Sequence, residues 1–134
     1  MNFDEFIGQV QHRARLSSRG EAERATRAVL ETLAQRLSGG EPKNLASQLP
    51  WEIGRYLLGP HSGEGARLGP RDFYDLVARR EGINIPDAAY HVRAVASVLR
   101  DAVSPGEWQK MLAQLPTDLD QLMESGSEGT APSL

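Results

Sequence analysis

The chain has 134 residues, of which 40% are hydrophobic and 25% are charged, as in ordinary globular proteins and unlike disordered or fibrous ones. It has no cysteine, which excludes disulfides, thiolate metal sites and a cysteine nucleophile, and suits a cytoplasmic location. The formal net charge is -3. Acidic side chains nearly balance basic ones in residues 1–58 and outnumber them in residues 59–124. Because phosphate binding needs a basic excess, this balance argues against a nucleic-acid partner.

No segment of the sequence has the features of a membrane-spanning helix or of a secretory signal peptide. It has no apolar run of the length that a spanning helix needs, about 18 residues or more. Its first residues, MNFDEFIGQV, are acidic where a secretory signal peptide is basic. We therefore expect neither a membrane association nor secretion.

Apolar residues recur with the 3.6-residue period of helices, and no segment alternates with the period of a strand. The first stripe consists of Phe3, Phe6, Ile7 and Val10. The second stripe consists of Ala22, Thr26, Val29, Leu30, Leu33 and Leu37. Ser18 followed by Glu21 predicts a capping box at the start of this second helix. A short third helix and a fourth, which begins after Pro50, complete the set.

The chain then repeats this pattern. RAV at residues 27–29 matches RAV at 93–95, and SGGE at 38–41 matches SPGE at 104–107. We predict an all-α fold of two tandem four-helix repeats, residues 2–58 and 71–124, packed as one pseudo-twofold bundle in a single domain, residues 1–125. A repeat of this size has marginal stability alone, and a core shared by the two repeats would stabilise both. The alternative is two bundles that move independently.

The segments between and after the repeats have a different composition. Residues 59–70, GPHSGEGARLGP, are rich in glycine and proline and predict an exposed linker. The glycines in this segment lack the spacing and the following lysine of nucleotide-binding loops. The tail, residues 126–134, has the composition of a disordered end.

Two pairs of turns invite comparison between the repeats. Gly40 and Gly106 are predicted to take the left-handed conformation that ends a helix. Arg15 stands where the second repeat has Gly82. If that turn is left-handed in both repeats, Arg15 is strained, since a β-carbon is disfavoured there. The glutamates that follow Gly40 and Gly106 are expected near the positive end of the next helix.

Four segments together resemble a known family. They are FDEF at residues 3–6, EAERATRAVLETLAQRLSGGE at 21–41, LASQLP at 45–50 and the degenerate MLAQLP at 111–116. In combination they are similar to the bacterial and archaeal family catalogued as domain of unknown function 2267. The resemblance implies an all-helical, internally duplicated protein, and it brings no activity, cofactor or catalytic residue with it.

The side chains that usually carry chemistry do not form a recognisable constellation. His12, His61 and His91 are not spaced by three or four residues from one another, as metal ligands on one helix face would be. Ser62 beside His61 lacks an identifiable orienting acid and oxyanion hole. We therefore expect a protein that is not an enzyme and that uses no cofactor or metal.

Arginines recur at equivalent positions of the two repeats: Arg13 matches Arg80, and Arg27 matches Arg93. One interpretation is that they pair with neighbouring acids such as Glu31 or cover apolar surface. The other is that they converge on an anionic ligand at the interface of the repeats.

The two tryptophans, Trp51 and Trp108, lie outside the repeated pattern. They either pack internally or form a contact surface for another molecule. We therefore carry two functional hypotheses. The first is a non-enzymatic helical interaction or scaffold module that contacts another protein or its own copy. The alternative is a small anionic-ligand-binding module that uses the four arginines.

Overall fold

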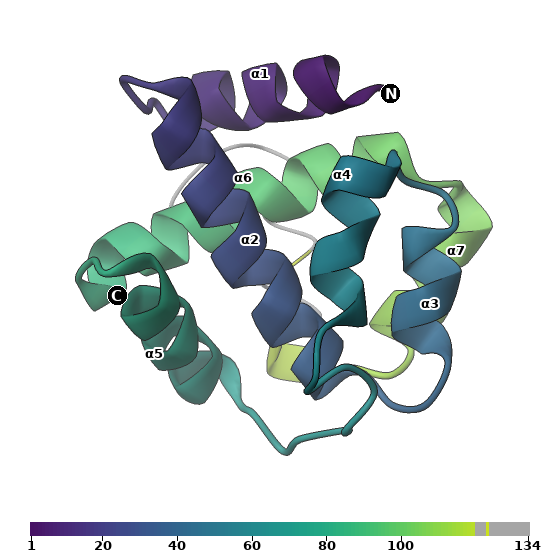
Figure 1. Ribbon diagram of the computed structural model, residues 1–134. Coiled ribbons are helices and arrows are strands. Elements are labelled where there is room, and N and C mark those ends of the chain that lie inside the picture. The colour runs from purple at the N-terminus through teal and green to yellow at the C-terminus, as the bar shows by residue number, and fades with distance from the viewer. Residues whose placement is uncertain (120–122, 124–134) are drawn as a thin grey trace.

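The structure, a computed structural model, describes residues 1–119 and 123, and this part of the chain is helical apart from its turns and one isolated bridge (Figure 1). The helices are α1 (Phe3–Arg13), α2 (Arg19–Arg36), α3 (Glu41–Ala46), α4 (Trp51–Gly54), the 3-10 helix η1 (Arg55–Leu58), α5 (Pro70–Glu81), α6 (Ile85–Ala102) and α7 (Pro105–Leu112). The all-α prediction is confirmed. The tail predicted for residues 126–134 lies outside the described residues. None of the described helices is long and apolar enough to cross a membrane.

Polar caps begin the first two helices. Asn2 Oδ1 accepts the Glu5 N–H at 2.8 Å and Glu5 Oε1 accepts the Asn2 N–H at 3.3 Å, which is a complete capping box. At α2, Ser18 Oγ accepts the Glu21 N–H at 3.2 Å. The Glu21 carboxylate instead accepts the hydroxyl protons of Ser17 at 2.6 Å and Ser18 at 3.1 Å. The predicted capping box is therefore half formed, because the Glu21 carboxylate bonds serine hydroxyls and not the Ser18 N–H.

The turns that follow α1 and α5 are left-handed. Arg15 has a φ of 54° and Gly82 a φ of 76°. The sequence left open whether both turns are left-handed, and the structure shows that they are. Arg15 bears a strain that glycine avoids, about 1 kcal/mol or more.

The prediction of a left-handed Gly40 and a left-handed Gly106 is wrong. Gly39 is the left-handed residue, with a φ of 60°, and Gly40, with a φ of -87°, begins α3 as its N-cap. Pro105 is the first residue of α7, so Gly106 lies inside that helix. The chain reaches that helix through extended backbone at Val103, and an extended link leaves no left-handed turn for glycine to make.

The glycine-rich segment 59–69 is not a free connector, because part of it is bonded to the end of α2. The N–H groups of Gly63, Gly65 and Ala66 donate to the carbonyls of Ala34, Leu37 and Gln35 at 2.8, 3.0 and 2.9 Å. Carbonyls at the end of a helix lack donors within the helix, and this segment supplies N–H donors to them. The pairing puts the φ of Gly63 at 79° and that of Gly65 at 64°.

The two long helices, α2 and α6, form the centre of the molecule. Each packs on both α1 and α5, and the two contact each other. In Figure 1, α2 runs across α6, with α1 at one end and α5 beside it, while α3 and α4 lie on the other side. The stripe from Val29 through Leu37 is buried, as predicted. Beyond the end of α2, α3 contacts α7.

Candidate functional site

Arg13 links α1 to α6. Its Nη1 donates to Ser97 Oγ at 2.9 Å and its Nη2 to Asp101 Oδ2 at 2.8 Å. The guanidinium is therefore already neutralised by a carboxylate. An arginine held in this way positions a helix and has little left with which to bind a free anion.

Arg80 links α5 to α2 in a corresponding way. Its Nη1 donates to Thr32 Oγ1 at 2.8 Å and its Nη2 to Gln35 Oε1 at 2.7 Å. These two neutral acceptors bond the Arg80 guanidinium without adding a negative charge. Arg80 also lines a hollow of about 200 Å³ with Tyr56 and His61, whereas Arg13 lines a separate hollow beside Arg15.

The other two candidate arginines differ from each other in exposure. Arg27 is exposed on α2 and its Nε bonds Glu31 Oε2 at 3.2 Å. Arg93 is 6% exposed on α6, close enough to Tyr74 to act on its charge; burial raises the pKa of that phenol, and Arg93 partly opposes the rise. The structure therefore does not bring Arg13, Arg27, Arg80 and Arg93 together in one site.

The two tryptophans have opposite environments. Trp108 is 2% exposed and belongs to the core on α7, so it offers no surface to a partner. Trp51 is 75% exposed at the first position of α4, directly after Pro50.

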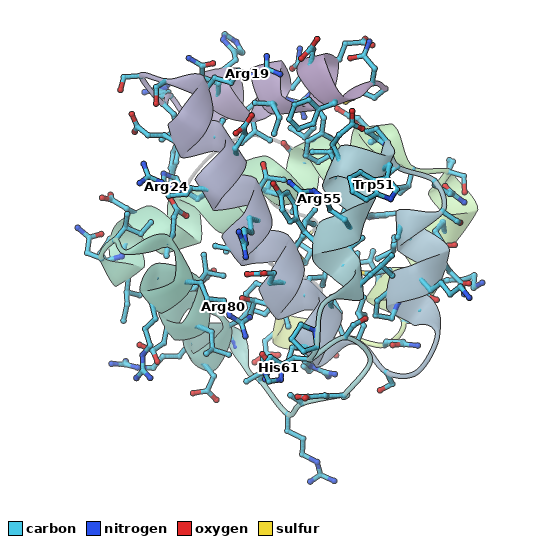
Figure 2. The ribbon with its side chains drawn as sticks, in the orientation of Figure 1. Arg19, Arg24, Trp51, Arg55, His61 and Arg80 are labelled. Carbon is cyan, nitrogen blue, oxygen red and sulfur yellow. The ribbon has the colours of Figure 1, made fainter. Side chains whose placement is uncertain are left out.

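Trp51 ends a row of alternating aromatic and arginine side chains on α4, η1 and α2. The Arg55 guanidinium lies 5.7 Å from the Trp51 ring centre and 4.7 Å from the Tyr56 ring centre. Beyond Tyr56, the Arg27 guanidinium lies 5.9 Å from the Tyr56 ring centre. We call Trp51, Arg55, Tyr56 and Arg27 the aromatic–arginine row; Figure 2 shows Trp51 and Arg55 together on the outer side of α4.

Hydrogen bonds hold Arg55 in the row. Its Nη2 donates to the Tyr56 hydroxyl at 3.2 Å and its Nε to the Glu52 carbonyl at 3.1 Å. Each cation–π contact at an exposed site contributes about 0.5–1 kcal/mol. These contacts favour the stacked arrangement of the side chains, and a favoured arrangement lowers the entropy cost of binding.

Sequence reasoning selected Trp51 and Arg27 but missed the residues between them. Neither Tyr56 nor Arg55 was singled out. The spacing of Trp51 and Arg55 by four positions was the available signal, since such residues share a helix face. The approach of Arg27, from α2, could not be read from spacing.

The described residues thus form an all-helical protein with an exposed tryptophan on the aromatic–arginine row, and they contain no cluster of three or more side chains suited to holding a metal. The chain belongs to the family described as an uncharacterized conserved protein, DUF2267, whose family model matches residues 3–122. The resemblance seen in the sequence is therefore confirmed. A comparison with curated proteins finds no match.

Proposed function

We propose that this protein is a non-enzymatic interaction module of the cytoplasm whose aromatic–arginine row docks an acidic segment of a partner protein. The observation that carries the proposal is the 75% exposure of Trp51 within the row. Tryptophan, tyrosine and arginine are the residues that most often dominate binding energy at protein interfaces.

The charges of the row favour an acidic occupant. Among the described residues Arg55 has no carboxylate within ion-pairing distance, and its bonds go to a carbonyl and a hydroxyl. Arg27 is already paired with Glu31, so Arg55 is the residue of the row that favours an acidic occupant. A partner carboxylate could therefore pair with Arg55 while an apolar side chain beside it covers the Trp51 indole.

We also propose that the module consists of the two repeats, residues 2–58 and 71–124, packed about a pseudo-twofold axis. Two reciprocal contacts support this arrangement. Arg13 of the first repeat bonds Asp101 on α6, and Arg80 of the second bonds Gln35 at the matching position of α2. Each repeat would thus complete the fold of the other.

The proposal is tested by peptide binding. Fluorescence polarisation would compare labelled peptides of one length, containing leucine and either glutamate, serine or lysine, against the intact chain at physiological salt. We expect the glutamate peptides to bind best. Trp51→Ala and Arg55→Ala should each weaken that binding by about tenfold or more, whereas Arg71→Ala, an exposed arginine on α5, should leave it unchanged.

Other outcomes would overturn the proposal. Equal binding of the three peptides, or full binding by Trp51→Ala, would remove the row from recognition. Tighter binding of a single-stranded DNA oligonucleotide would indicate base stacking instead. A dimer seen by analytical ultracentrifugation and lost in Trp51→Ala would make a second copy of the chain the occupant.

A further inference from the structure

Two glutamates meet where α3 contacts α7. Glu41 is the first residue of α3 and Glu107 lies in the first turn of α7. They occupy the same place in the repeated SGGE and SPGE segments. Their exposures are only 5% and 8%, although glutamate is almost never buried unless it is paired.

No cation pairs with either carboxylate among the described ion pairs, and Oε1 of Glu41 and Oε2 of Glu107 are buried without a hydrogen-bond donor. The position near a helix start explains why a carboxylate is tolerated there, but it does not explain why both are buried against each other. Two adjacent buried carboxylates cannot both be ionised cheaply, so a shared proton is the simplest solution.

The surroundings favour that proton. Burial, and then the hydrogen bond and like charge of Glu107, raise the pKa of Glu41 to about 7. Asn44 on α3 and Lys110 on α7 act in the opposite direction without cancelling the rise. Lys43, also on α3, is exposed.

We propose that Glu41 and Glu107 form a proton-holding pair that closes the contact between α3 and α7, and that loss of the proton loosens this contact. The device is separate from the docking proposal. Its effect would nevertheless reach the docking surface, because α3 contacts α4, on which Trp51 lies.

The sign of the pH effect follows from the direction of the pKa. The folded state holds the proton more tightly than the unfolded chain, where a glutamate has its ordinary pKa of about 4.3. Stability from this pair is therefore fully present below that pKa and is lost as the pH rises to about 7. One linked proton changes the unfolding equilibrium constant by up to about tenfold per pH unit.

Trp108 provides a local probe, because it follows Glu107 in the sequence and is buried on α7. In the Trp51→Phe variant it is the sole tryptophan. We expect its emission to change with a midpoint near pH 7. Adding Glu41→Gln should abolish the transition, because an amide donates the bridging hydrogen at every pH.

Glu52→Gln, a change at an exposed glutamate on α4, should leave the transition in place. Urea unfolding at about pH 5 and pH 8 gives a second readout. Glu41→Gln and Glu107→Gln should each be more stable than the unaltered chain at the higher pH and lose most of its pH dependence.

An emission curve that is flat near neutral pH would overturn the proposal. So would a transition that persists in both glutamine variants, since a histidine would then be responsible. If millimolar Ca²⁺ or Mg²⁺ restored the low-pH emission at pH 8, the pair would be a cation site rather than a proton-holding one.

Discussion

The backbone N–H of Ser38 donates to Gln114 Oε1 at 2.9 Å. The same bond recurs with the roles exchanged, since the Ser104 N–H donates to Gln48 Oε1 at 2.7 Å. In each case a glutamine from the LASQLP or MLAQLP segment bonds the residue that precedes the short helix of the other half. These bonds flank the contact between α3 and α7.

Removing one of these acceptors should weaken the contact. Gln114→Leu leaves the Ser38 N–H without its partner, and we expect the free energy of unfolding to fall by about 1 kcal/mol. Gln114→Glu keeps an acceptor oxygen and should lose less at neutral pH. Urea denaturation of the two variants measures the difference, and an equal loss in both would show that the bond contributes nothing.

The strain at Arg15 should be removable. Arg15 has a φ of 54°, so Arg15→Gly is expected to raise the free energy of unfolding by about 0.5–1 kcal/mol. The reciprocal variant, Gly82→Arg, places a β-carbon at a φ of 76° and should lower it by a similar amount. Thermal unfolding of both would contradict this account if Arg15→Gly were the less stable protein.

The docking of segment 59–69 on α2 depends on a glycine. A β-carbon at Gly63 would lie 2.5 Å from the Gly39 carbonyl oxygen, and the φ of Gly63 disfavours it further. Gly63→Ala should therefore destabilise the fold by about 2 kcal/mol. Gly59→Ala, in the same segment with open space around it, is the matched control and should change little. Similar denaturation midpoints would argue that the segment is free of α2.

Arg80 should be sensitive to a change that keeps its charge. Lysine cannot reproduce the two bonds to Thr32 and Gln35, so Arg80→Lys should cost about 1–2 kcal/mol of stability. Its neighbour Arg79 forms an exposed pair with Asp75, and Arg79→Lys should cost about 0.5 kcal/mol or less. Equal effects in urea denaturation would mean that Arg80 acts only through its charge.

Local patterns accounted for most of the fold. The stripe from Val29 through Leu37 is buried as its spacing predicts. Aligning Arg15 with Gly82 marked a turn worth comparing, although the alignment did not decide its handedness. The burial of the stripe follows from interactions within one or two turns of helix, which a local sequence pattern records.

The site was less predictable for the same reason. Composition could not decide that Trp108 is buried and Trp51 exposed, since exposure depends on which helices meet. The four arginines were chosen by recurrence, but Arg13 and Arg80 find partners on other helices, whereas Arg27 pairs with Glu31 on its own helix. The glutamate pair was read as two separate helix-start residues, because a local pattern cannot show that α3 and α7 place them together.

By itself, then, the sequence determined that this chain forms helices, where their apolar faces lie and where several of them begin and end, because backbone hydrogen bonding and side-chain period act over a few residues. Only the tertiary structure decided which side chains became neighbours. The approach of Arg27 from α2 to the Tyr56 ring, and the burial of Glu41 against Glu107, arise from packing between segments that are distant in the sequence, which a local pattern cannot record.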